Sequence, residues 1–184
     1  MLELRRQGFH ALLGLFLVIL LNFNLINLKI LIIVFILGIL TSILSKKYKI
    51  KGIEWFLKNF DREVNVRGMG IITYFIGVIL ALFLFEKRIA LASIIILAFG
   101  DSFCHLGRFG SLKNPFNDLK YIEGILIGIA VSTFGAVFFV SFLQALLGSS
   151  IAMIFESLDV KIKGKKIDDN ILVPVIAGIV MSLL

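Results

Sequence analysis

Residues 89–102 read Ile-Ala-Leu-Ala-Ser-Ile-Ile-Ile-Leu-Ala-Phe-Gly-Asp-Ser, an apolar run that ends at the carboxylate of Asp101. A charged side chain at the centre of a bilayer costs roughly 2.5–3.5 kcal/mol, so a carboxylate in such a run marks a functional site by default. Further polar and ionisable groups stand at the ends of other apolar runs. They are Arg5, Arg6, His10, Glu123, Glu156, Asp168, Asp169 and Asn170. If these ends share one side of a membrane, the chain builds a charged pocket there.

The composition excludes a soluble domain and favours an all-α integral membrane protein. Hydrophobic residues make up 59% of the 184 residues and charged residues 17%, whereas average globular chains carry about 25% charged residues. Isolated strands cannot satisfy their backbone groups in lipid, so we expect each apolar run to form a helix. The length has room for about seven transmembrane helices in a single domain over residues 1–184. The expected spans are 8–26, 28–44, 70–85, 89–106, 122–140, 144–158 and 170–184.

The apolar stretch from Ile122 to Ser157 is too long for one span. Its 36 residues would form a helix of about 54 Å, against a hydrocarbon core of about 30 Å. We therefore divide it near Ser141–Gln144, with Gly148-Ser149-Ser150 as the alternative turn.

A short amphipathic helix is expected between the second and third spans. Ile53, Phe56, Leu57 and Phe60 recur at helical spacing, with Trp55 beside them and lysines around them. This pattern favours an interfacial helix on the inner leaflet, and the alternative is an amphipathic connector with no role beyond anchoring.

The distribution of basic residues predicts the orientation. With the N-terminus in the cytoplasm, the inner segments hold sixteen of the 19 Lys and Arg residues, and the outer segments hold only Lys29, Lys87 and Arg88. The net charge of +7 is thus explained by topology, and no nucleic-acid partner is expected. All the polar helix ends named above then lie at the cytoplasmic face of a cell-membrane protein. A transporter is expected to carry its essential charges near the midplane, so this pattern favours an enzyme that takes one soluble and one lipid substrate.

The segment from Gly100 to Gly110 contains the elements of a phosphate site. Gly107 and Gly110 allow the backbone to approach a ligand closely. Arg108, Lys113 and Lys120 add positive charge, and Asp101 with a second carboxylate suits Mg²⁺. Together they predict a nucleoside triphosphate site. The alternative assigns the glycines to helix caps and the basic residues to topology. Cys104 is the only cysteine, which excludes an internal disulfide and a Cys-based zinc cluster.

The order of the motifs along nearly the whole chain resembles the polyprenol kinase family, which contains dolichol kinase, phytol kinase and the CTP-dependent diacylglycerol kinase. The motifs are Arg5-Arg6-x-x-x-His10, Asp61-Arg62 ahead of Gly68 and Gly70, Gly100-Asp-Ser, Gly107-Arg-x-Gly110, Lys120-x-x-Glu123-Gly124, Glu156 and Asp169-Asn-x-x-Val-Pro. The resemblance implies transfer of the γ-phosphate of CTP to the hydroxyl of a membrane lipid alcohol, with Mg²⁺ or another divalent cation.

The resemblance also implies roles for individual residues. Asp101, Glu123 and Asp169 are the expected metal ligands, and Glu156 or His10 would take the hydroxyl proton. Nucleotide and phosphate contacts are expected from Arg5, Arg6, Ser102, Gly107, Arg108, Gly110, Lys113, Lys120, Gly124 and Asn170. Two departures affect the nucleotide contacts. Tyr121 replaces the usual serine, and the loop from Ser102 to Gly110 is about a residue shorter than in the family and contains Cys104-His105.

Several alternatives stay open at this point. A CTP:phospholipid cytidylyltransferase would use the same nucleotide and the same kind of carboxylates, and a small transporter or flippase is the candidate from another class. The lipid acceptor is dolichol or polyprenol, phytol or geranylgeraniol, or diacylglycerol, and the preference for CTP over ATP rests on the resemblance alone. Gly124-x-x-x-Gly128 predicts a close helix contact, with a substrate groove as the alternative.

Overall fold

The computed structural model describes residues 2–48, 51–60, 68–105, 110, 112–114, 117–158, 161–162 and 165–184. Within these ranges, only the backbone is described for 2, 46–47, 56–58, 117–120, 161–162 and 165–166. The described chain is mostly helical, which confirms the helical class expected from the sequence. The helices are α1 (Leu2–Asn22), α2 (Leu28–Lys47), α3 (Lys51–Phe60), α4 (Met69–Leu84), α5 (Lys87–Ile95), the π-helix η1 (Ile96–Asp101), α6 (Ser102–Cys104), α7 (Ile122–Ala136), α8 (Phe142–Ser157) and α9 (Asp169–Ser182).

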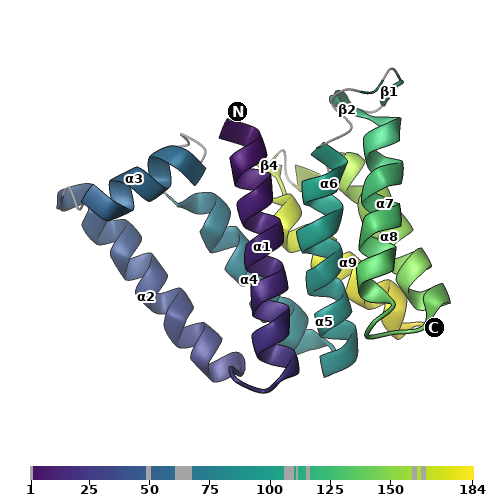
Figure 1. The fold of residues 1–184 in the computed structure, drawn as a ribbon, viewed down its shortest axis with the longest axis horizontal. Coiled ribbons are helices and arrows are strands. Elements are labelled where there is room, and N and C mark those ends of the chain that lie inside the picture. The colour runs from purple at the N-terminus through teal and green to yellow at the C-terminus, as the bar shows by residue number, and fades with distance from the viewer. Residues whose placement is uncertain are drawn as a thin grey trace.

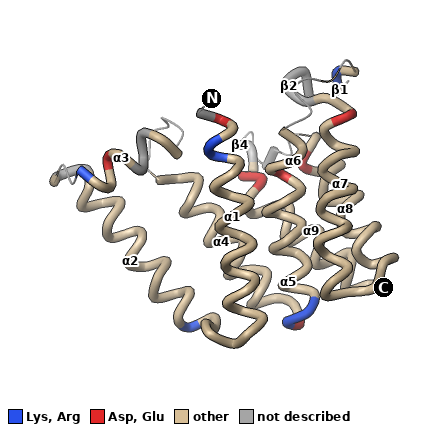
Figure 2. The backbone as a smooth tube through the Cα atoms, viewed as in Figure 1, with Lys and Arg blue, Asp and Glu red and all other residues tan. Residues whose placement is uncertain are grey.

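The long helices alternate in direction, so their ends gather at two opposite faces of the bundle (Figure 1). The face that holds the start of α1, the end of α6 and the starts of α7 and α9 is called the polar end here. At the opposite face, Lys29 lies in the first turn of α2, and Lys87 and Arg88 lie in the first turn of α5. Figure 2 shows the charged residues at or near these two faces and an almost uncharged tube between them.

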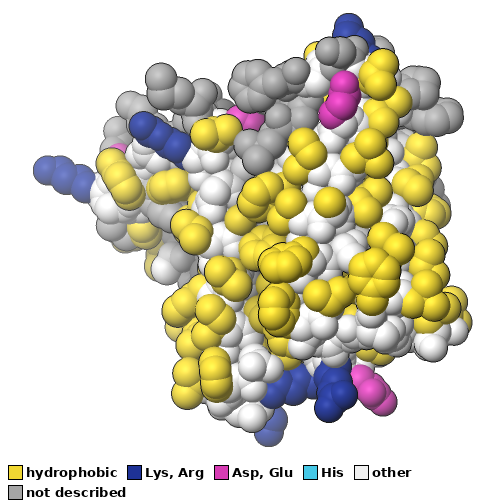
Figure 3. All heavy atoms as spheres, turned by 45° about the vertical axis from the view of Figure 1, so that its right-hand side comes forward, with side chains coloured by type: hydrophobic (Ala, Val, Ile, Leu, Met, Phe, Trp, Pro, Cys, Tyr) yellow, Lys and Arg dark blue, Asp and Glu magenta, His cyan; other side chains and the backbone are white. Residues whose placement is uncertain are grey.

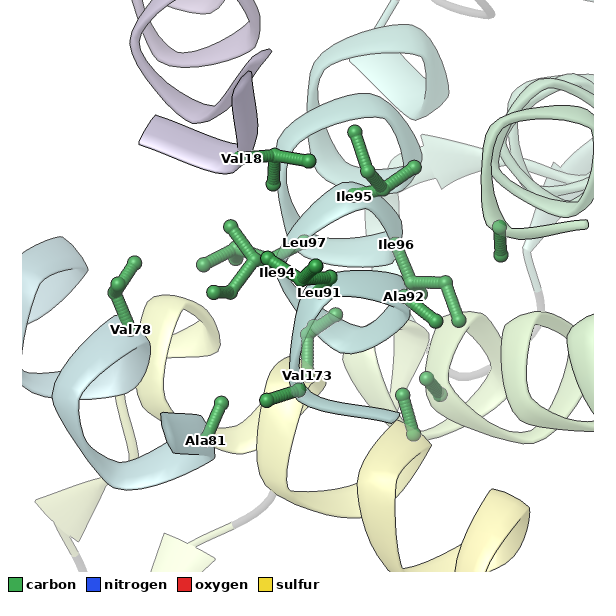
Figure 4. Close-up of a cluster of buried hydrophobic side chains, with 14 of the residues drawn as sticks. Val18, Val78, Ala81, Leu91, Ala92, Ile94, Ile95, Ile96, Leu97 and Val173 are labelled. Carbon is green, nitrogen blue, oxygen red and sulfur yellow. The ribbon is translucent and has the colours of Figure 1, made fainter. Parts of the chain in front are cut away.

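Helix α5, η1 and α6 form one continuous rod through the centre of the bundle. Every residue from Ala90 to Ala98 is at most 3% exposed, because this segment is apolar on all sides except for Ser93, and a helix of that kind is stable only when it is buried. The rod contacts α1, α4, α7, α8 and α9. In Figure 4 its side chains lie among Val18 of α1, Val78 of α4 and Val173 of α9.

The outside of the bundle is apolar as well. Figure 3 shows hydrophobic side chains across the visible flank between the two charged ends. In α2, only 11% of Leu28–Ser45 is buried, and the residues turned inward form a single stripe against α4 that includes Leu31 and Ser45. Phe134, Phe138 and Phe142 are each at least 66% exposed, whereas Phe139 packs partly against the core.

Two helices of the described chain are long and apolar enough to cross a membrane, namely α1 over Glu3–Asn22 and α2 over Leu28–Ser45. Helices α4, α7, α8 and α9 are apolar but shorter than 18 residues. The bounds of six expected spans agree with helices to within about four residues at either end, while the crossing of a membrane by seven helices stays a prediction. The first differs more, because α1 begins at Leu2, six residues before the expected start, and ends at Asn22.

The break between α7 and α8 confirms the expected division near Ser141–Gln144. The Ser141 hydroxyl accepts the backbone N–H of Gln144 at 3.3 Å, and the Gln144 side chain accepts the backbone N–H of Ser141 at 3.1 Å. This reciprocal capping box starts α8. The alternative turn at Gly148–Ser150 is wrong because α8 continues through it, and Gly148 instead allows α8 to approach Met181 of α9 closely.

Two small hairpins were not predicted from the sequence. Strand β1 (Lys113–Asn114) pairs antiparallel with β2 (Asn117–Tyr121), and β3 (Lys161–Ile162) pairs antiparallel with β4 (Lys165–Lys166). The first hairpin directly precedes α7 and the second precedes α9, so both lie at the polar end (Figure 1). Their strands are too short and too polar for an alternating apolar pattern to reveal them.

Glycines permit several of the helix crossings. A Cβ added at Gly77 of α4 would collide with the carbonyl oxygen of Asn170 in α9, and one added at Gly14 of α1 would collide with the Tyr74 hydroxyl and with Ala98. Gly128 of α7 lies against the Gly100 carbonyl oxygen, so the expected close helix contact of the Gly124-x-x-x-Gly128 motif is present. Small residues at such contacts are typical of helices packed in lipid.

Replacing Gly77 with Ala is predicted to lower the free energy of unfolding by about 1–3 kcal/mol, because the new methyl group meets backbone rather than a movable side chain. Titration with sodium dodecyl sulfate, followed by circular dichroism, measures this change. Gly38→Ala in α2 is the matched control, since no atom lies within 4 Å of its added Cβ. Equal effects of the two substitutions would contradict the described crossing of α4 and α9.

Candidate functional site at the polar end

The inner face of α1 changes from apolar to polar as the helix reaches the polar end. Gly14, Leu17 and Val18 of this face pack in the core, and the preceding turns place Arg6, Gln7 and His10 on the same side. These three polar side chains are 8%, 5% and 6% exposed. Residues three and four positions apart share one face of a helix, so these polar side chains are buried at the polar end of an otherwise apolar face.

Glu3 is the centre of a network between α1 and the end of the central rod. One of its carboxylate oxygens accepts hydrogen bonds from Arg6 Nη2 at 2.5 Å and from Gln7 Nε2 at 3.1 Å. The same oxygen lies 3.3 Å from Nε2 of His105, whose Nδ1 lies 3.0 Å from the backbone oxygen of Asp101. The network ties the first turn of α1 to the residues that follow η1.

Asp101 lies at the meeting point of three helices. The turn of η1 is a π-helix, a form that occurs often at functional sites, and it ends at this carboxylate. Asp101 interacts electrostatically with both His10 of α1 and Tyr74 of α4, and Asp168 at the start of α9 also acts on His10. The side chain of Asp101 is only 13% exposed, so these interactions are weakly screened by water.

Hydrogen bonds fix the helices around this group. Ser102 Oγ donates to the backbone oxygen of Gln7 at 2.9 Å, which joins α6 to α1. The Tyr74 hydroxyl donates to the backbone oxygen of His10 at 3.3 Å, and the two rings meet edge to face with centroids 5.1 Å apart. The position of His10 in α1 is therefore fixed by Tyr74 of α4, through both its backbone oxygen and its ring.

The start of α9 is anchored to α4. Asp168 caps α9 by accepting the backbone N–H of Asn170 at 3.0 Å. The side-chain nitrogen of Asn170 donates to Thr73 Oγ1 at 3.0 Å and to the Gly70 backbone oxygen at 3.3 Å. Asn170 was expected to contact nucleotide, but its side-chain amide nitrogen forms hydrogen bonds that join α9 to α4.

A second polar group lies on another face of α6. Glu156, near the end of α8, is fully buried, and Cys104 Sγ donates to its Oε2 at 3.8 Å. The next residue, Ser157, accepts a hydrogen bond at its backbone oxygen from Asn114 Nδ2 at 3.4 Å. A buried carboxylate is thus held between α6, α8 and the first hairpin.

Several expected site residues lie outside these two groups. Glu123 accepts the backbone N–H of Leu112 at 3.0 Å, at the start of α7, where a negative charge also favours the helix dipole. Arg5 is exposed and donates to Asn59 Oδ1 of α3 at 3.1 Å, and Lys113 is exposed on β1. Gly124 is buried in the first turn of α7, and Gly110 and Asp169 are half-buried. Gly107, Arg108 and the side chain of Lys120 lie outside the described residues.

Sequence reasoning did not select Glu3, Gln7, Tyr74 or His105 as site residues. Glu3 and Gln7 carry a signal in hindsight, because they stand at helical spacing from Arg6 and His10 on one face of α1. Tyr74 carries a weaker one, as a tyrosine within an apolar run. In the ranges that the structure describes, no group of three or more His, Cys, Asp or Glu side chains is placed to hold a metal ion, so the metal site stays a prediction.

Comparison with known proteins adds no relative from which a role could be transferred. No family model matches the chain, and neither a curated protein nor a solved structure shows significant similarity to it.

The bond between Asn170 and Thr73 is predicted to stabilise the contact of α9 with α4. Asn170→Ala should lower the free energy of unfolding by about 1–3 kcal/mol, because it removes the two hydrogen bonds from the Asn170 side chain to α4. Thr73→Ala should then cost little more in the double variant, whereas Ser182→Ala at the exposed end of α9 should change stability by less than about 0.5 kcal/mol. Strictly additive effects of Asn170→Ala and Thr73→Ala would refute this interaction.

Proposed function

We propose that this chain is a multi-pass membrane enzyme that transfers the γ-phosphate of CTP to the hydroxyl of a membrane lipid alcohol. The reaction takes place at the polar end, which faces the cytoplasm. The observation that carries the proposal is the gathering of Asp101, Asp168, Arg6 and His10 at one end of a bundle whose core and flanks are apolar.

The apolar surface supports a membrane location. In water, the exposed Leu, Ile and Phe side chains of α2 and the other outer helices would cost roughly 25 cal/mol for each Å² of apolar surface. A bilayer removes this cost, and it also accounts for the confinement of charged residues to the two ends of the helices. The excess of Lys and Arg in the segments at the polar end supports a cytoplasmic orientation of that end.

The polar end provides the chemical groups that phosphoryl transfer needs. The lipid hydroxyl oxygen attacks the γ-phosphorus, and a new oxygen–phosphorus bond forms. The bond from that phosphorus to the oxygen bridging to the β-phosphate breaks, and the nucleoside diphosphate leaves with its electron pair. The hydroxyl proton passes to a protein base, for which His10 and Glu156 are the candidates. Catalysis of this reaction consists mainly of positioning and of stabilising negative charge, and Arg6 contributes to the latter.

Carboxylates at this end are donors of the kind that a divalent cation takes. Asp101 with Asp168 or Asp169 would hold it through carboxylate oxygens, and Mg²⁺ typically takes one or two carboxylates together with phosphate oxygens and water. When bound, the cation neutralises part of the charge on the triphosphate. The choice of CTP, and of dolichol, polyprenol, phytol, geranylgeraniol or diacylglycerol as acceptors, is supported by the resemblance of the motif order to the polyprenol kinase family.

Purified protein in lipid nanodiscs is predicted to transfer label from γ-labelled CTP to one of these lipid alcohols and to release CDP. No label should reach the lipid from α-labelled CTP, because only the terminal phosphate moves. Label from the α position with release of pyrophosphate would identify a cytidylyltransferase instead. If no nucleotide is consumed with any acceptor in the panel, the enzymatic proposal is wrong.

Asp101→Asn is predicted to reduce kcat on the order of 100-fold, since it removes a charge that positions the metal-bound triphosphate. Glu86→Gln is the matched control, because Glu86 is an exposed carboxylate at the opposite end of the same rod. Size-exclusion chromatography and circular dichroism verify that both variants are folded. A folded Asp101→Asn variant with the turnover of the control would exclude Asp101 from the reaction.

A further inference from the structure

A row of aromatic rings connects α3 with the buried polar group of α1. Trp55 and Phe60 of α3 meet with ring centroids 6.1 Å apart, and Phe60 lies 5.2 Å from Phe9 of α1. Phe9 is followed by His10 at 6.4 Å and His10 by Tyr74 at 5.1 Å. These five residues are called the aromatic row below. Such ring distances are within the range of favourable aromatic contacts.

The outer end of the row lies on the bundle surface. Helix α3 lies across the polar end rather than along the bundle, as Figure 1 shows, and Trp55 is 64% exposed. The hydrogen bond from Arg5 to Asn59 and the ring contact of Phe9 with Phe60 attach α3 to the first turns of α1. Tryptophan prefers the level of the lipid headgroups, and an amphipathic helix of this kind lies in that layer.

At the inner end of the row, buried polar atoms of α1 have no hydrogen-bond partner among the described residues. In the part of the chain that the structure describes, no partner reaches Nδ1 of His10, Nε of Arg6 or Oε1 of Gln7. All three side chains are more than nine-tenths buried. Leaving a buried polar atom unpaired costs about 1–3 kcal/mol, so three of them on one helix face indicate that a polar ligand group binds there.

We infer that the aromatic row is the docking surface for the acceptor lipid, an inference that rests on the proposed function. The apolar chain of a lipid alcohol lies against Trp55, Phe60 and Phe9, and its terminal hydroxyl hydrogen-bonds to Nδ1 of His10. A ligand with an apolar body and a single polar terminus matches both ends of the row. The lipid reaches the site sideways from the headgroup layer, while the nucleotide arrives from water.

The only tryptophan of the chain reports on this docking directly, without any need for turnover. Geranylgeraniol or dioleoylglycerol, titrated into phosphatidylcholine nanodiscs that contain the full-length protein, is expected to produce a saturable change in Trp55 emission. Phe9→Ala should weaken the apparent affinity about three- to tenfold, in line with the loss of aromatic contacts. Phe134→Ala, which removes one ring of the exposed pair Phe134 and Phe138 with centroids 5.8 Å apart, is the matched control and should leave the affinity unchanged.

A second comparison tests the hydroxyl contact. Wild-type protein should bind geranylgeraniol more tightly than its methyl ether, and His10→Phe should bind the two equally, because only the contact to Nδ1 is lost. Equal effects of Phe9→Ala and Phe134→Ala, or no saturable change with either lipid, would overturn the docking surface. Saturable docking without phosphorylation would uphold the surface and refute the kinase, whereas phosphorylation that is insensitive to Phe9→Ala would refute only the surface.

Discussion

The burial of the central rod is the constraint on which the rest of the structure depends. Residues 90–98 are apolar except for Ser93 and are surrounded by α1, α4, α7, α8 and α9. A rod enclosed in this way can expose polar groups only at its ends, and its π-helical turn brings Asp101 to the polar end. The surrounding helices place polar residues near that carboxylate at their own ends, and His10 of α1 interacts electrostatically with both Asp101 and Asp168. The charged group thus follows from the way in which the rod is buried.

Much of this architecture could be predicted from the sequence, because apolar runs and caps are local signals. The division near Ser141–Gln144 followed from an apolar stretch too long for one span, and the structure places the start of α8 there. The hairpins β1–β2 and β3–β4 were missed because strands of two to five mostly polar residues give no clear apolar alternation. Partners such as Glu3, Tyr74 and His105 were missed for another reason. The contacts that join them to other helices link residues far apart in the sequence, as in the bond from Tyr74 to His10 and the approach of Glu3 to His105, and the sequence pattern does not contain that information.

The candidate site is divided between two buried groups with different characters. Around His10, several helices contribute carboxylates, a guanidinium and three polar atoms that have no partner among the described residues. Around Glu156, a carboxylate is enclosed by the thiol of Cys104 and by the end of α8. The first group suits the proposed transfer better, since it has both charge for a triphosphate and free hydrogen-bonding capacity for an acceptor. The aromatic row adds an apolar approach from α3 to the same residues, so lipid and nucleotide could meet at His10 from different phases.

The central claim is that the helix ends that carry these residues meet at one aqueous surface of a membrane. Single cysteines introduced into a Cys104→Ala background test it, with Lys51→Cys and Leu112→Cys at the polar end and Asn24→Cys and Arg88→Cys at the opposite end, all at exposed positions. In sealed inside-out vesicles, a membrane-impermeant maleimide is expected to label the first pair at once and the second pair only after permeabilisation. Labelling of Lys51→Cys and Leu112→Cys from opposite sides would contradict the account.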